Sequence, residues 1–114
     1  MAESLEIDHV DQGILSLRGP LTMENVSPFL NAVRRESAPT VILDFAGVPY
    51  LDSSGLGSLV SAYTSFRKAG RRVALTGVNQ RVMRVFEITK VEPIFLMFPT
   101  VAEALEALTN AGTA

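Results

Sequence analysis

The hydrophobic period changes back and forth along the chain, and this alternation constrains the fold more than any other feature of the sequence. Short stretches of alternating or continuous apolar residues are typical of β-strands. Stretches in which apolar residues recur three and four positions apart are typical of helices that bury one face. Because the two kinds of stretch follow one another along the chain, we expect an α/β fold. In such a fold, helices connect the strands of a mixed, mostly parallel sheet.

The pattern predicts a sheet of about five strands with about four helices. Strands are expected at 5–8, 14–17, 41–45, 72–76 and 95–98, the first two as a hairpin. Helices are expected to carry the apolar residues of 26–33, 56–66, 82–86 and 105–108. Strand 41–45 is nearly all apolar, so it belongs at the centre of the sheet with both faces covered. The apolar residues 95–98 are expected to be mostly buried.

Length and composition indicate one domain that spans residues 1–114. A chain of 114 residues, 47% of them hydrophobic and 19% charged, can bury one core but not two. The net charge of -2 gives no positive field, so we expect no nucleic acid partner. The absence of cysteine excludes disulfides and thiolate sites. The N-terminus lacks a signal-peptide pattern and no apolar run could span a bilayer, so we expect a cytoplasmic protein without membrane contact.

A short polar segment, Asp52-Ser53-Ser54, lies between the central strand and the second helix. Aspartate and serine are preferred helix caps, so these residues alone need be no more than structural. However, the helix starts beyond the carboxyl end of a buried strand, where its unpaired N–H groups favour an anion or a phosphate. Gly55 and Gly57 follow without the further glycine or lysine of a nucleotide-binding loop. We therefore interpret them as glycines needed for close packing.

The same region carries a resemblance to a known family. Residues 41–57, V-I-L-D-F-A-G-V-P-Y-L-D-S-S-G-L-G, resemble the signature segment of STAS-domain anti-sigma factor antagonists. The similarity continues through residues 19–21, 82–89 and 103–105 and so covers effectively the whole chain. It implies that Ser54 is phosphorylated by a partner anti-sigma factor that is itself a serine kinase. The unphosphorylated protein is then expected to bind this partner and release its sigma factor, and phosphorylation is expected to end the binding.

The resemblance also implies a partner-binding surface around this serine. Its expected members are Asp44, Asp52, Ser53, Gly55 and Thr22. Thr22 departs from the family pattern, because many of these antagonists have an acidic residue there, and its effect on phosphorylation is left open. A phosphoserine phosphatase is implied as a second partner, and no cofactor is implied. Both a monomer and a weak homodimer remain open.

Two other functions compete with this hypothesis. STAS-like domains also serve as ligand- or nucleotide-binding accessory modules of transporters and lipid-trafficking systems. A hydrolase with Ser54 as its nucleophile would need a general base, and the only histidine, His9, lies in the predicted hairpin. We therefore expect no catalytic residue and no enzyme.

The remaining charged residues predict no further site. Asp44, Asp52 and Glu24 have no metal-ligand spacing, so no metal is expected. Arg81 and Arg84 are expected to face solvent. The basic residues near Gly70, at positions 67, 68, 71 and 72, are expected to form a solvated helix end.

Overall fold

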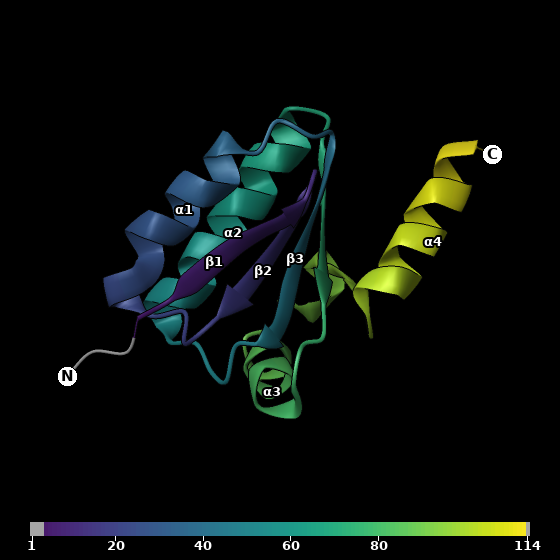
Figure 1. Ribbon diagram of the computed structural model, residues 1–114. Coiled ribbons are helices and arrows are strands. Elements are labelled where there is room, and N and C mark those ends of the chain that lie inside the picture. The colour runs from purple at the N-terminus through teal and green to yellow at the C-terminus, as the bar shows by residue number, and fades with distance from the viewer. Residues whose placement is uncertain (1–3, 114) are drawn as a thin grey trace.

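The computed structural model describes residues 4–113 and shows the alternation of strands and helices that the sequence predicts (Figure 1). The strands are β1 (Glu6–Asp11), β2 (Ile14–Arg18), β3 (Thr40–Gly47), β4 (Arg72–Thr76) and β5 (Leu96–Phe98). The helices are α1 (Val26–Arg35), α2 (Ser53–Lys68), α3 (Gln80–Ile88) and α4 (Val101–Thr113). Short 3-10 turns at Met23–Asn25 and Glu92–Ile94 precede α1 and β5.

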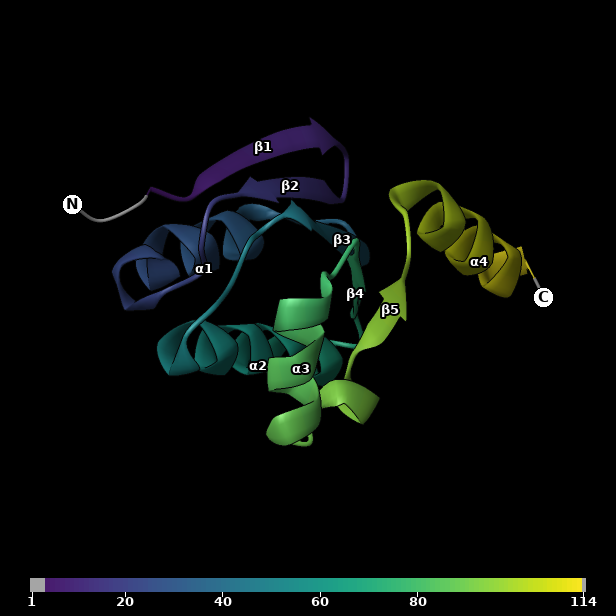
Figure 2. The ribbon, with the colours of Figure 1, turned by 90° about the horizontal axis from the view of Figure 1, so that it is seen from below.

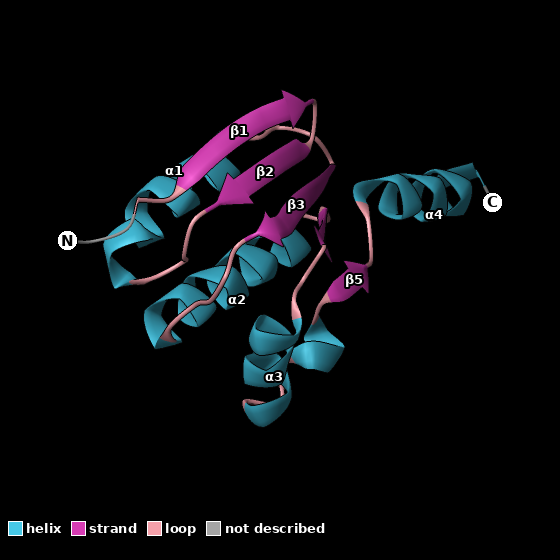
Figure 3. Ribbon diagram, turned by 60° about the horizontal axis from the view of Figure 1, so that its bottom comes forward, coloured by secondary structure: helices cyan, strands magenta, loops and turns pink. Residues whose placement is uncertain are grey.

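The five strands form one mixed sheet in the order β1-β2-β3-β4-β5. β1 and β2 pair in antiparallel fashion, and the other neighbours pair in parallel. The prediction of an α/β fold with β3 at the sheet centre is therefore confirmed. Helices α1 and α2 lie on one face of the sheet, whereas α4 lies on the opposite face (Figures 2 and 3).

The alternating side chains of β3 divide the hydrophobic core between these two faces. Val41, Leu43 and Phe45 belong to the large cluster that includes residues of α1, α2 and α3. Ile42 belongs to a smaller cluster with Ala104 and Leu108 of α4, the helix on the opposite face of the sheet. Each fully buried large apolar side chain contributes about 1.5–3 kcal/mol to stability. The buried strand thus anchors the loop that follows it at the carboxyl edge of the sheet.

The last strand is less buried than the sequence suggests. Phe95 is 7% exposed and packs against the rings of Phe86 and Tyr63. Leu96, however, is 41% exposed, and Met97 and Phe98 are only partly buried. The prediction was wrong for Leu96 because β5 is a three-residue edge strand that pairs with β4 alone.

One arginine of the basic segment that follows α2 is structural. Arg71 donates hydrogen bonds to the carbonyls of Glu36 and Ala38, at 2.5 and 2.7 Å. Its guanidinium also lies 4.0 Å from the ring centroid of Phe66. The expectation of a purely solvated basic cluster was therefore wrong for Arg71, which joins the end of α2 to the α1–β3 connection.

The two glycines near the start of α2 have opposite surroundings. A Cβ on Gly55 would lie 2.0 Å from the carbonyl oxygen of Leu21, so Gly55 is needed for close packing as predicted. A Cβ on Gly57 would meet nothing within 4 Å, and Gly57 is exposed. The prediction of close packing was wrong for Gly57, because no neighbouring atom requires a glycine at this position of the helix.

These surroundings predict opposite stability effects for the same substitution. Gly55→Ala should destabilise the domain by about 1–3 kcal/mol, because the added methyl group forces backbone apart in a packed region. Gly57→Ala is the matched control and should stabilise it by about 0.5–1 kcal/mol, because alanine is the better helix former. Thermal unfolding measures both, with shifts of about 4–8 °C per kcal/mol. A Gly55→Ala variant as stable as the wild type would contradict this packing.

Candidate functional site

The first turn of α2 presents the two serines at the protein surface. Asp52 is the N-cap residue, and its Oδ1 accepts a hydrogen bond of 2.8 Å from the Gly55 N–H. Ser53 is exposed and Ser54 is half-buried. The predicted placement of both serines at a surface helix start is confirmed. Because Asp52 does the capping, neither serine side chain is needed as the cap of this helix.

The carboxylate of Asp52 also joins two loops. Its Oδ2 accepts a hydrogen bond of 3.0 Å from the Met23 N–H, which lies in the loop between β2 and α1. The two loops are further paired by the Leu21–Leu51 bridge and by hydrogen bonds from Leu21 N–H to Tyr50 oxygen (3.1 Å) and from Asp52 N–H to Leu21 oxygen (3.2 Å). The loop after β2 is therefore fixed beside the start of α2.

This hydrogen bonding stabilises the charged form of Asp52. The Gly55 N–H is the main group that lowers the pKa of the Asp52 carboxyl below its ordinary value of 3.8, and the Met23 and Ser54 N–H groups act in the same direction. Partial burial opposes them and raises the pKa. The net pKa is lowered, so the carboxylate that is already ionised at neutral pH keeps its negative charge to lower pH, directly beside Ser53 and Ser54.

The structure brings together four of the five residues expected to form the partner-binding surface. Thr22 directly precedes Met23 in the loop that Asp52 holds, and its Oγ1 accepts a hydrogen bond of 3.4 Å from the Asn25 side chain. The fifth residue, Asp44, lies apart from the other four. Its Oδ1 accepts hydrogen bonds of 3.1 Å from both the Thr76 hydroxyl and the Ala46 N–H.

Asp44 alternates along β3 with Leu43 and Phe45, which point into the core beneath α1 and α2. Its side chain therefore points to the face of the sheet opposite α2. Side-chain alternation thus turns Asp44 away from the helix that carries Ser54, and its expected role in partner binding stays a prediction.

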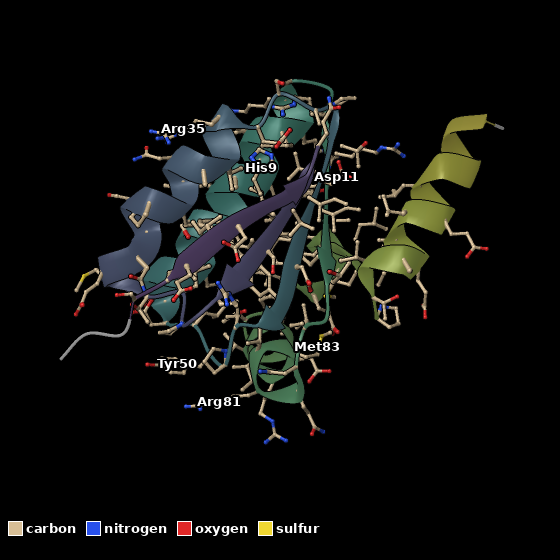
Figure 4. All side chains as sticks on the ribbon, viewed as in Figure 1. His9, Asp11, Arg35, Tyr50, Arg81 and Met83 are labelled. Atoms are coloured by element: carbon tan, nitrogen blue, oxygen red, sulfur yellow. The ribbon has the colours of Figure 1, made fainter. Side chains whose placement is uncertain are left out.

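Sequence reasoning missed a contact between α3 and the loop before Ser54. The Asn79 Nδ2 donates hydrogen bonds of 3.1 and 3.2 Å to the carbonyls of Val48 and Pro49, while its Oδ1 caps α3. The Arg81 guanidinium lies 4.9 Å from the ring centroid of Tyr50, and Figure 4 shows this pair at one end of the fold. Only the capping role of Asn79 is visible in the sequence, because the loop contacts join residues about thirty positions apart.

The only histidine does not lie beside Ser54. The Nε2 of His9 contacts the carboxylate of the buried Glu36, and Figure 4 shows His9 at the end of the fold opposite Tyr50. His9 is therefore not placed to act as a general base for Ser54. Among residues 4–113, no group of three or more histidines and acids is close enough to hold a metal ion. None of the helices in this range is long and apolar enough to cross a membrane.

Comparison with known proteins agrees with the fold. An anti-sigma-B factor antagonist of Listeria monocytogenes is 30% identical over 89 residues, which are 78% of this chain and 78% of the relative. The anti-sigma factor antagonist SpoIIAA, solved unphosphorylated, superimposes with a TM-score of 0.70 at 20% identity, over 93% of this chain and 96% of its own. The phosphorylated form of SpoIIAA from Bacillus gives a TM-score of 0.65 at 20% identity, over 91% and 98% of the two chains.

The fold also occurs beyond the antagonists. A sulfate transporter family protein from Wolinella succinogenes gives a TM-score of 0.79 at 21% identity, over 94% of this chain and 93% of its own. At this identity the likeness concerns the fold alone. The STAS domain pattern matches residues 2–104. This match, together with the Listeria relative, shows that the chain belongs to the STAS domain family.

Proposed function

We propose that this chain is an anti-sigma factor antagonist that binds a serine-kinase anti-sigma factor and is released when that kinase phosphorylates Ser54. The observation that carries the proposal is the position of Ser54, in the first turn of α2 and partly open to solvent. The antagonist role of the Listeria relative supports it. A phosphoserine phosphatase would restore the binding form, and the cycle would run in the cytoplasm without nucleic acid, membrane or cofactor.

The start of α2 can carry a phosphate without unfolding the domain. A phosphoserine adds about -1.5 to -2 charges at neutral pH, and the dipole at a helix N-terminus partly stabilises this charge. The cap itself does not depend on Ser54, because Asp52 accepts the Gly55 N–H. The added phosphate should therefore change the surface and leave the core intact.

The same phosphate should oppose a bound partner. It would place a hydrated dianion beside the ionised Asp52, and a protein that covers this surface would have to remove water from both groups. Asp52 accepts hydrogen bonds from Met23 and Gly55, so the surface around the two charged groups cannot easily rearrange to separate the charges. Phosphorylation thus weakens binding through desolvation and repulsion.

The exposed Gly57 supports docking at this face of the helix. It lies three and four positions after Ser54 and Ser53, and so one turn further along the same face. A glycine inside a helix costs about 0.5–1 kcal/mol relative to alanine, and no neighbour requires it here. We interpret Gly57 as the residue that lets a partner approach the α2 backbone closely.

The switch predicts different effects for two substitutions of Ser54. Ser54→Asp should weaken binding to the serine-kinase anti-sigma factor of the source organism at least about tenfold, because a buried, unpaired carboxylate opposes the interface. Ser54→Ala should bind nearly as well as the wild type but accept no phosphate. Calorimetry measures the affinities, and thermal melts should show that both variants stay folded. A Ser54→Asp variant and a phosphorylated wild type that both bind at full affinity would refute the switch.

Gly57→Ala should separate stability from function. We expect the variant to melt at a higher temperature and yet to bind the same kinase several-fold more weakly, because the new methyl group holds the partner away from α2. Ser65→Ala, at an exposed position near the other end of α2, is the control and should not change the affinity. Undiminished binding by Gly57→Ala would show that the partner does not approach the helix at this residue.

A further inference from the structure

Helix α3 exposes two arginines and an isoleucine on one face. We name Arg81, Arg84 and Ile88 the α3 ridge, because their spacing of three and four positions places them on one side of the helix. Ile88 is 72% exposed, whereas Val82 and Phe86 on the other side are buried. Ile88 thus adds one apolar side chain to a face that is otherwise charged, and a protein interface combines apolar and polar groups in this way.

The α3 ridge continues the surface around Ser54. Arg81 lies over the ring of Tyr50, which precedes Asp52 by two residues (Figure 4). Met23 is 71% exposed, and its N–H donates to the Asp52 carboxylate. Tyr50 and Asp52 belong to one loop, and both are hydrogen-bonded through their backbone to Leu21, so Met23, Asp52, Tyr50 and Arg81 lie on neighbouring segments.

A partner needs more surface than the first turn of α2 offers. Specific protein complexes bury about 800 Å² on each partner, which is the area of some twenty residues. The neighbouring α3 ridge supplies two arginines, and Tyr50 and Met23 lie between it and the start of α2 or beside that start; arginine, tyrosine and methionine are all enriched at interfaces. The Arg81 side chain is already oriented by the Tyr50 ring, so less conformational entropy is lost on binding.

The arginines of the ridge are available for pairing. Within residues 4–113, neither Arg81 nor Arg84 lies within ion-pair distance of a carboxylate, and both are exposed as the sequence predicts. The ion-pair contacts found among residues 4–113 instead involve Arg18 and His9, which lie in strands β2 and β1. Two cations that are not paired with a carboxylate of this domain complement negative charge on another protein.

We propose that the α3 ridge is the second half of the docking surface and that it fits an acidic protein surface with an apolar recess for Ile88. This inference rests on the proposed function, because the occupant is the same anti-sigma factor. It also deepens the switch. A partner surface rich in carboxylates is attracted by Arg81 and Arg84 and is repelled by a phosphate on Ser54, so one charge pattern serves both capture and release.

Charge reversal on the ridge tests the proposal. The double variant Arg81→Glu/Arg84→Glu should bind the serine-kinase anti-sigma factor of the source organism at least about tenfold more weakly than the wild type. Wild-type affinity should fall when ionic strength rises from about 0.05 to about 0.5 M, and the double variant should lose this dependence. Ile88→Ala should weaken binding several-fold, because it removes the apolar anchor.

The control changes the same charge elsewhere. Arg34→Glu/Lys68→Glu reverses two exposed cations near the ends of α1 and α2, away from Ser54, and should keep the affinity within about twofold. Thermal melts of all variants establish that they are folded at the assay temperature. Calorimetry at the two ionic strengths then gives the affinities.

The outcomes separate the two proposals. If the wild type binds, Ser54→Asp binds weakly and the ridge variants bind like the wild type, the ridge proposal is overturned and the proposed function stands. If the wild type itself fails to bind the kinase, the proposed function fails and the ridge proposal falls with it. If the ridge variants and the charge control weaken binding equally, the effect belongs to net charge, and the ridge proposal is also overturned.

Discussion

The carboxylate of Asp52 is the interaction on which the functional surface depends. One oxygen accepts the Gly55 N–H and so starts α2, and the other accepts the Met23 N–H and so holds the loop that follows β2. These N–H groups lower its pKa and so favour the ionised form, which an aspartate already has at neutral pH. Ser54 is thus presented on a fixed surface beside a negative charge.

The residues that build the fold and those assigned to recognition are largely different. Gly55 packs against the Leu21 carbonyl, and the sheet is anchored by the buried β3. Gly57 and Ile88, in contrast, are exposed, and the structure gives neither a packing role. This separation explains how a modification could change recognition and leave the domain folded. It would also explain why the proposed docking surface contains residues, such as a glycine within a helix, that stability alone would not favour.

Rules that relate residues close together in the sequence were enough to predict most of the fold. Hydrophobic period identified each strand and helix, and capping chemistry located the starts of α2 and α3 at Asp52 and Asn79. The failures were non-local. Gly55 and Gly57 look alike in sequence, but only the helix orientation decides which of them meets Leu21. The Arg81–Tyr50 contact joins segments that only the folded sheet brings together.

The central claim is that Ser54 is the switch, and mapping the phosphate tests it most directly. The chain would be incubated with ATP and the serine-kinase anti-sigma factor of the source organism, and tandem mass spectrometry of its peptides would locate the modification. The account predicts a single phosphate on Ser54, an unmodified Ser53, and dissociation of the complex as the phosphate accumulates. A phosphate on another residue, or a chain that binds the kinase but is never phosphorylated, would contradict it.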